Sequence, residues 1–455
     1  MKPKQILILG IIFGLLVLGV LAKQFQKPAE LATDEFVALD LSFEKDQVKG
    51  IEIYKGEGLR EEEKVEIAKV GEGWRVSSLF GARADKKKID ELLEGIQAAK
   101  GEIRGRSPEL FGDFKIRDEE AFHIRLLNGT GKEVLHLLVG LKKAGFQSIF
   151  IRKKEMAFVF LTDANLLTQI GVFGDPEEDK PGSDYWASTQ MVTIDPEKVK
   201  RIETVRFEEG KGVMTSSVAL ETDPYDSTKS DWVLQRDEVP FPVDGGKITK
   251  FLETLNNARA QKIVNPEDKV GALESPVWRL TLWVAEEEPW VMTAGARDEA
   301  TNSYPVRVST EPVVFQLSEY YFKRFDIDDS QFFSANPLGV EADKVEKLSL
   351  KVDKKEKVFS FEEEKSEEMK TYLNGLKDFK VERLLFDIKE KSGVKSPGDA
   401  WLEIQIKDKP LALIDVTQKK DDDKEYFAVM RGNTHPFVIS KTTYEKLFKD
   451  IDKLK

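Results

Sequence analysis

Hydrophobic and polar positions alternate along this chain in two regular ways, one typical of helices and the other typical of strands. An apolar residue recurs every three or four positions in the segments 89–96, 248–255 and 369–376. Such spacing gives a helix one apolar stripe, so we predict three helices that each lie on a sheet. In the segments 121–127 and 277–284 apolar and polar residues alternate, which predicts strands because successive side chains point to opposite faces.

Matching residues precede the first two helices. Asp85 and Asp244 stand directly before KKKIDELLEGI and GGKITKFLETL. An Asp side chain accepts hydrogen bonds from the free amides of the first helical turn, so we predict that both residues are N-caps. A predicted strand with a tryptophan, Trp74 or Trp232, lies before each cap, and the third copy has neither the tryptophan nor the Asp.

The order of these elements repeats along the chain. Each copy opens with a strand, around Ile51, Ile202 and Leu348, at spacings of about 150 residues. A second strand, the helix, four further strands and a terminal helix follow each opening. We therefore predict three modules of the order β-β-α-β-β-β-β-α, mainly antiparallel because short turns join most strands.

The predicted fold class is α+β: three tandem, mainly antiparallel β-sheet modules, each with helices packed on the sheet, after one N-terminal transmembrane helix. With 455 residues, the chain is long enough for each module to bury its own core. The predicted domains are residues 1–33 for the membrane anchor and tether, 34–173 for module 1, 183–328 for module 2 and 329–455 for module 3.

The segment 6–22 contains no charged residue. As a helix it would span about 26 Å, which suits a short membrane-crossing segment. Because Lys2 and Lys4 precede it, we predict a single-pass protein of the bacterial cytoplasmic (inner) membrane, with its N-terminus inside and the bulk of the chain extracytoplasmic or periplasmic. A signal peptide cleaved after Ala22 is the alternative, and it exports the same residues.

Gly10 and Gly14 form a GxxxG pair within this apolar segment. Small residues at this spacing let two membrane helices approach closely, so the pair is a candidate for membrane-helix packing and for a homo-oligomer. Glycine is also common in membrane helices in general, and that interpretation is the simpler one.

The charge and composition of the chain argue against nucleic acid as a partner and exclude cysteine chemistry. Lys and Arg total 70 against 82 Asp and Glu, which gives a formal net charge of −12 with both signs interspersed. This argues against nucleic acid, whose phosphates require a basic face. The chain has no cysteine, so disulfides, thiolate nucleophiles and cysteine-bound zinc are excluded.

No residue pattern predicts a catalytic, metal or cofactor site. The histidines His123, His136 and His435 lack metal-ligand spacing such as HExxH. A turn at 128–132 places His123 and His136 on neighbouring strands, so we predict a partly buried structural pair. No phosphate-binding loop or nucleophile elbow is present. Clustered carboxylates, such as those at 286–288, are interpreted as solvated loop tips.

Aromatic residues gather near the joints between the predicted modules. They either pack one module on the next, as a repeat array requires, or form a surface for a protein partner. The candidate residues for this partner or inter-module surface are Tyr185, Trp186, Tyr320, Tyr321, Phe332 and Phe333.

Several of these segments resemble an uncharacterised bacterial family, domain of unknown function 4340. The likeness lies in the tryptophan strands followed by RADKKKIDELLEGI or PVDGGKITKFLETL, and in VGALESPVWRLTL, and it extends over residues 34–455 and the N-terminal helix. The resemblance implies a membrane-anchored, extracytoplasmic protein of a kind often associated with ABC-type export or gliding-motility-like transporter components. It implies no catalytic residue.

The resulting hypothesis is a non-enzymatic, membrane-anchored binding or scaffolding protein, accessory to an ABC-type transport or gliding-like complex, with transporter subunits as partners and no cofactor. The alternative is an exported hydrolase or carbohydrate-binding protein with a carboxylate-lined cleft between modules, since a catalytic pair could lie anywhere among 82 carboxylates. A structural spacer that sets the distance from the membrane is a third interpretation.

Overall fold

The computed structural model describes residues 39–454 apart from short gaps. These gaps are residues 57–62, 143–148, 176–177, 224–226, 236–240, 353, 362–364, 386–391, 408, 410, 419–423, 434, 449–450 and 452–453. The predicted membrane segment 6–22, with Gly10 and Gly14, lies outside the described residues. Among the helices that are described, none has both the length and the apolar character needed to cross a membrane.

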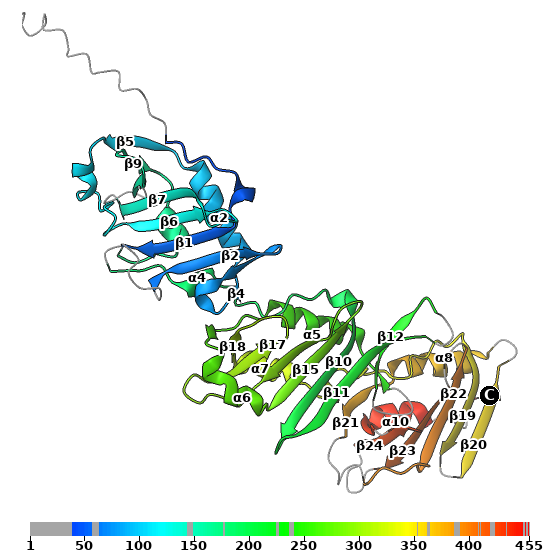
Figure 1. Ribbon diagram of the computed structural model, residues 1–455. Coiled ribbons are helices and arrows are strands. Elements are labelled where there is room, and N and C mark those ends of the chain that lie inside the picture. The colour runs from blue at the N-terminus through cyan, green and yellow to red at the C-terminus, as the bar shows by residue number, and fades with distance from the viewer. Residues whose placement is uncertain are drawn as a thin grey trace, which may run out of the picture. The chain divides into compact units, whose positions relative to one another are not determined.

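The first sheet contains nine strands in the order β4-β3-β2-β1-β6-β7-β8-β9-β5 (Figure 1). Its strand pairs are antiparallel. The strands are β1 (Gly50–Lys55), β2 (Val65–Val70), β3 (Gly73–Val76), β4 (Ala82–Arg83), β5 (Gly101–Gly105), β6 (Phe122–Leu127), β7 (Glu133–Lys142), β8 (Ile149–Lys153) and β9 (Val159–Thr162).

The second sheet has the same strand order as the first, β13-β12-β11-β10-β15-β16-β17-β18-β14. The two sheets are therefore copies of one topology. The strands are β10 (Val199–Glu208), β11 (Lys211–Thr222), β12 (Ser230–Leu234), β13 (Phe241–Pro242), β14 (Lys262–Val264), β15 (Trp278–Val284), β16 (Trp290–Ala294), β17 (Ser303–Val308) and β18 (Val314–Ser318).

The third sheet has seven strands in the order β20-β19-β22-β23-β24-β25-β21. Among the described residues, this is the strand order of the other two sheets without the counterparts of β3 and β4, or of β12 and β13. The strands are β19 (Val345–Val352), β20 (Lys355–Ser360), β21 (Val381–Leu384), β22 (Ala400–Ile406), β23 (Ala412–Gln418), β24 (Glu425–Met430) and β25 (Phe437–Ser440).

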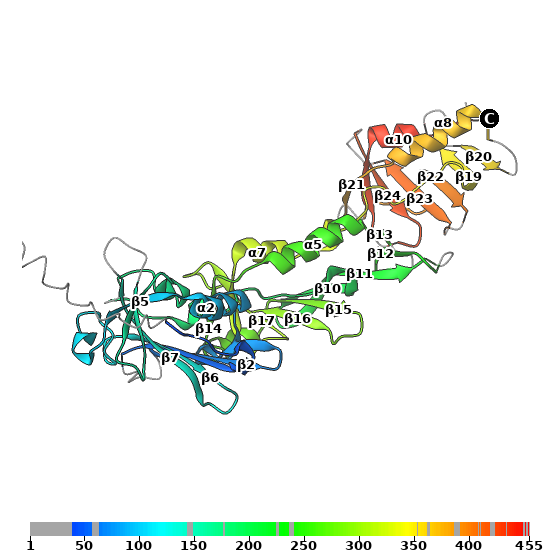
Figure 2. The ribbon, with the colours of Figure 1, turned by 90° about the horizontal axis from the view of Figure 1, so that it is seen from above.

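In the sequence of each copy, the main helix follows the opening strands and precedes the remaining strands of the sheet. Figure 2 shows α5 and α7 along one face of the second sheet, and α8 and α10 along one face of the third. The helices are α2 (Lys86–Ala98), α3 (Leu166–Gln169), α4 (Ser183–Trp186), α5 (Gly245–Asn257), α6 (Val270–Glu274), α7 (Glu319–Phe325), α8 (Glu367–Gly375) and α10 (Lys441–Phe448).

The predicted helices are confirmed, and so are the two predicted N-caps. The Asp85 carboxylate accepts from the Lys87 amide at 3.0 Å, and the Asp244 carboxylate accepts from the Gly246 amide at 2.9 Å. The third copy uses Ser366 at this position. The apolar stripes are buried against the sheets, and each buried aliphatic or aromatic side chain stabilises the fold by roughly 1.5–3 kcal/mol. In α5 the buried residues are Ile248, Phe251, Leu252 and Leu255.

The predicted strand alternation is also confirmed. In β6, Phe122, Ile124 and Leu126 are buried. In β22, Leu402 and Ile404 are buried at alternate positions. The cores of the three copies are thus built from the inward faces of the strands and the stripes of the helices.

The predicted order of elements has six strands in each copy, whereas the described residues form sheets of nine, nine and seven strands. The segments that leave the main helices are strands β5, β14 and β21, which cross to the far edge and pair with the last strand of the same sheet. In the first two copies the tryptophan segments form β3 and β12, each followed by a short further strand. The predicted α+β class of three antiparallel sheets with helices holds, with more strands than expected.

The described chain divides into two compact units. The first contains the first sheet and ends at Ala187, without residues 80–82. The second runs from Ser188 onward, takes in residues 80–82, and contains the second and third sheets.

Candidate functional site

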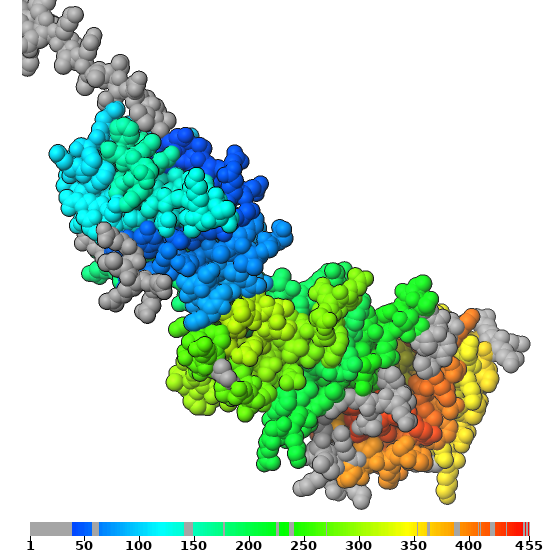
Figure 3. All heavy atoms as spheres, viewed as in Figure 1, coloured from blue at the N-terminus to red at the C-terminus, as the bar shows by residue number. Residues whose placement is uncertain are grey.

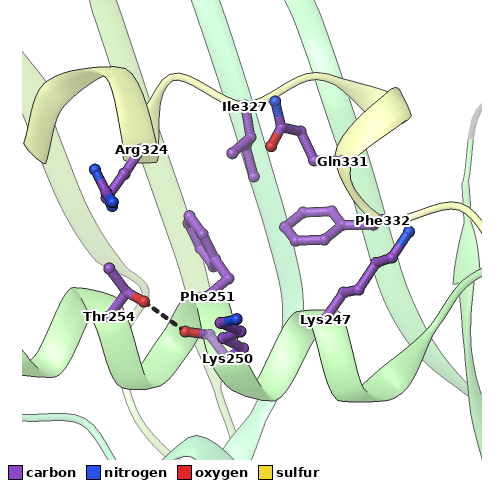
Figure 4. Close-up of a pocket in the computed structure, with 8 residues that line it drawn as sticks. All are labelled: Lys247, Lys250, Phe251, Thr254, Arg324, Ile327, Gln331 and Phe332. Atoms are coloured by element: carbon purple, nitrogen blue, oxygen red, sulfur yellow. Dashed lines mark hydrogen bonds between the residues drawn. The ribbon is translucent and has the colours of Figure 1, made fainter.

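A pocket lies between α5, α7 and the short 3-10 helix η7 (Asp329–Gln331) in the second copy (Figure 4). Its volume is about 160 Å³. Binding sites for drug-sized molecules have volumes of roughly 300–1,000 Å³, so this pocket fits a group the size of one side chain. The lining residues are Lys247, Lys250, Phe251, Thr254, Arg324, Ile327, Gln331 and Phe332.

Two phenylalanines form the apolar part of the pocket. Phe251 projects from α5 and Phe332 follows η7, and their rings meet edge to face with centroids 5.5 Å apart. Phe332 is buried, and Phe251 also contacts Phe325 of α7. The pocket wall is therefore held by the same apolar stripe that packs α5 on the sheet.

Three cationic side chains surround this apolar part. The Lys247 ammonium donates to the Phe333 carbonyl oxygen at 3.1 Å and lies 4.7 Å from the centre of the Phe333 ring. The Arg324 guanidinium lies 3.8 Å from the centre of the Tyr320 ring. Contacts with aromatic rings and carbonyl groups position the cations without neutralising their charge.

Lys250 completes the set of cations. It is exposed, and among the described residues it has no ion-pair partner. Thr254, one turn along α5, donates to the Lys250 carbonyl oxygen at 2.7 Å, which is the dashed line in Figure 4. None of the described residues that line the pocket is acidic, although the chain as a whole is acidic. This arrangement suits a carboxylate or another anionic group beside an apolar surface.

The third copy has a pocket at the corresponding place, between α8 and α10, with a volume of about 460 Å³. When Met369 is aligned with Ile248, Glu368 occupies the position of Lys247 and Thr371 that of Lys250. The described lining contains three glutamates and one lysine, so its charge is opposite to that of the second copy. The residues are Glu367, Glu368, Thr371, Tyr372, Glu445, Lys446 and Leu454.

Three of the candidate aromatic residues from the sequence converge on the cationic pocket. Phe332 lines it, Phe333 contacts Lys247, and Tyr320 contacts Arg324. Tyr320 is 59% exposed, whereas Phe332 is buried. Tyr321 lies beside Tyr320 and stacks on Phe325 with ring centres 6.0 Å apart.

Tyr185 and Trp186 belong to the first unit, whereas the pocket belongs to the second. Trp186 is fully buried, and its carbonyl oxygen accepts from the Asp85 amide at 2.7 Å. The Lys88 ammonium lies 4.1 Å from the centre of the Tyr185 ring. These two aromatics therefore hold the start of α2, much as Phe332 and Phe333 hold the start of α5.

The predicted histidine pair is confirmed on the first sheet. His123 Nδ1 lies 2.9 Å from His136 Nε2, and His123 Nε2 donates to the Asp118 carbonyl oxygen at 2.8 Å. With Nε2 as the donor, His123 Nδ1 accepts from His136. Burial lowers the pKa of both imidazoles, that of His136 to about 4 despite the nearby Glu133 carboxylate.

Beside the histidine pair, the Asp118 carboxylate forms ion pairs with Arg152 and Lys154. Burial opposes ionisation of Asp118, but contacts from Lys154 and Arg152 outweigh it and lower the pKa of Asp118. In the part of the chain that the structure describes, no group of three or more His, Asp and Glu side chains is arranged to hold a metal ion. The cluster fits a structural polar network within the sheet.

Most of the residues of the cationic pocket were not predicted from the sequence. Lys247, Lys250 and Thr254 share one face of α5, but the helical pattern there was read only for its apolar stripe. Comparison of the copies gives a usable signal, since the position of Lys250 is Glu91 in α2 and Thr371 in α8. Arg324 could not be placed beside them, because its contact with α5 is non-local.

The fold and pocket define a tandem-repeat α+β protein with a side-chain-sized cationic pocket in the second copy. The chain belongs to the family described as domain of unknown function (DUF4340), whose profile matches residues 74–270 and 232–397. The matches begin at Trp74 and Trp232, the tryptophans of β3 and β12, so the family unit recurs in register. No curated protein and no solved structure matches the chain.

Proposed function

We propose that this protein is a non-enzymatic, membrane-tethered extracytoplasmic scaffold that binds a partner protein, as an accessory of an ABC-type transport complex. The observation that carries the proposal is the cationic pocket of the second copy. Lys247, Lys250 and Arg324 surround two phenylalanines, and no acidic residue is among the described residues that line the pocket. Its ligand is an Asp or Glu side chain of the partner.

The size of the pocket supports a protein partner over a small molecule. A volume of about 160 Å³ accommodates one side chain, and the apolar floor of Phe251 and Phe332 suits the methylene groups of a glutamate. Arg324 can bind a carboxylate with two parallel hydrogen bonds, which fixes its orientation.

The arrangement of the chain supports a scaffold. The three sheets share one strand order, shortened by two strands in the described part of the third, while the charge of the corresponding pockets differs between the second and third copies. One fold repeated with different surfaces can hold different groups at once, which is how repeat proteins present extended binding surfaces. The apolar segment 6–22 provides the tether to the membrane.

Charge reversal in the pocket tests the proposal. The full chain should purify from its native membrane together with permease and ATPase subunits of the transporter. The double variant Lys250→Glu and Arg324→Glu should lose these subunits. Like charges that face each other across an interface typically cost several kcal/mol, so we expect a loss of at least about a hundredfold in affinity. Quantitative mass spectrometry of the detergent-solubilised complex measures the recovery.

A matched control has the same change in net charge at other positions of the second copy. Lys200→Glu and Lys262→Glu replace two exposed lysines on β10 and β14, outside the pocket. This variant should retain the subunits. A wild-type chain that purifies alone, or a pocket variant that retains its partners, would contradict the proposal.

A further inference from the structure

The outer edge of the third sheet is open in the described part of the chain. β20 is the last strand on that side, and it lies at the surface of the third copy (Figures 1 and 3). In the other two sheets, the strand at the same place, β2 or β11, is followed outward by two more strands. In the described residues, the third sheet therefore ends two strands earlier on this side than its copies do.

Comparison with the first sheet shows what the outer strand covers. Ile67 of β2 is opposite Ile51 on one side and opposite Val76 of β3 on the other, and Ile67 is buried. In the third sheet the matching residue is Phe359, which is opposite Leu348. Phe359 is only partly buried, because no described strand takes the place of β3.

The second sheet gives the same result and adds a second position. Val218 of β11 is opposite Leu234 of β12, and Leu220 is opposite Trp232. Phe361, two residues after Phe359, corresponds to Leu220 and is also only partly buried. The covering strand therefore has an aromatic side chain two residues before an aliphatic one, as Trp232 and Leu234 do here.

At every second residue of β20, the backbone amide and carbonyl groups point away from the rest of the sheet. The Phe361 amide donates to the Glu346 carbonyl oxygen at 2.9 Å, so Phe361 bonds toward β19. In an antiparallel ladder the bonding direction alternates, which directs the amide and carbonyl groups of Glu356, Val358 and Ser360 away from β19. Val358 is 56% exposed. This is the geometry that accepts an added strand.

From this comparison we infer that β20 binds, in the antiparallel direction, an extended segment of a partner protein that carries an aromatic side chain two residues before an aliphatic one. The aromatic side chain lies beside Phe361 and the aliphatic one beside Phe359, as in the first two copies. β20 itself lacks this pattern, since Lys355 and Lys357 occupy the alternate positions before Phe359. A second copy of β20 is therefore not the occupant.

A labelled peptide with the sequence of residues 71–78, GEGWRVSS, is a probe for this edge. Fluorescence anisotropy with the detergent-solubilised full chain should show saturable binding. Val358→Pro removes an outward amide and no bond to β19, so the sheet is retained while binding weakens by about tenfold or more. Val358→Thr keeps the amide and the branched shape, and should bind as the wild type does.

Two further measurements separate the outcomes. Serine in place of both Trp74 and Val76 in the peptide should abolish binding, and Phe361→Ser in the protein should weaken it. The pocket variant Lys250→Glu with Arg324→Glu should bind the peptide normally, since the edge is independent of the pocket. Equal binding to the Val358→Pro variant overturns the inference. A dimer that this variant dissociates, without peptide binding, overturns it too by making a second copy the occupant.

Discussion

At the position of Lys250, the first copy has Glu91 and the third has Thr371, whereas the next position along each helix keeps a large apolar residue, Leu92, Phe251 or Tyr372. The apolar residue is fixed by packing, because its side chain fills the space between helix and sheet. The neighbouring polar residue has no such constraint. Single residues on this face therefore set the charge of each pocket without changing the fold.

The histidine pair makes stability depend on pH. Burial lowers the pKa of His136 from 6.5 to about 4, so between these values the unfolded chain binds a proton that the folded chain does not. The free energy of unfolding should therefore fall as the pH decreases from about 6.5 to about 4, by on the order of 2 kcal/mol. Urea unfolding of the full chain, followed by circular dichroism at several pH values, measures it.

The variant His136→Gln provides the control for this titration. Glutamine keeps a side-chain donor and does not titrate, so the difference in unfolding free energy between wild type and variant should shrink toward pH 4. A difference that is constant across the range would show that His136 does not carry the pH dependence.

At the scale of elements, local patterns determined what could be predicted from the sequence. The stripe of α5 and its cap at Asp244 depend on residues within one or two turns, and both were predicted correctly. Strand β14 was missed, because only its pairing with β18, some fifty residues later, makes three residues a strand. Such pairing is set by tertiary contacts rather than by local propensity.

The caps are expected to contribute measurably to stability. Asp244→Ala removes the acceptor for the first-turn amides of α5 and should destabilise the chain by about 1 kcal/mol. Asp244→Asn keeps an acceptor oxygen and should cost less. Both free energies can be measured by urea unfolding, and an alanine variant as stable as the wild type would show that the cap has no net effect.

At the scale of the whole molecule, the second unit holds two sheets together by specific contacts. Phe241 of β13 packs against Phe437 of β25 with ring centres 5.9 Å apart. His435 Nε2 lies 3.0 Å from Asp329 Oδ2, and both side chains are buried. Asp329 belongs to η7, which also leads to Phe332 in the pocket. The pocket is thus built beside the contact between the two copies.

Removal of this buried pair should destabilise the second unit. His435→Ala is expected to cost about 3 kcal/mol, since removing one partner of a buried hydrogen bond leaves the Asp329 carboxylate buried without this contact. A double-mutant cycle with Asp329→Ala should give a coupling energy above about 1 kcal/mol. Additive effects of the two substitutions in chemical unfolding would exclude a direct interaction.

The pocket itself was only partly accessible from the sequence. The candidates Tyr320, Phe332 and Phe333 were chosen as aromatics near a predicted joint, and all three contact the pocket or its cations. The cations were not chosen, because exposed lysines and arginines are frequent in this chain and only the fold shows which ones converge. Lys247 and Arg324 come from helices separated by more than sixty residues.

The shorter sheet of the third copy also affects how homologous repeats are counted. Both family matches begin at a tryptophan of the outer strands, and neither begins in the third copy, whose described residues form no such strands. A count of family matches would thus give two repeats, whereas the strand order shows three. Terminal repeats in related chains are liable to the same undercount, and the connectivity of the remaining strands is the better marker of common ancestry.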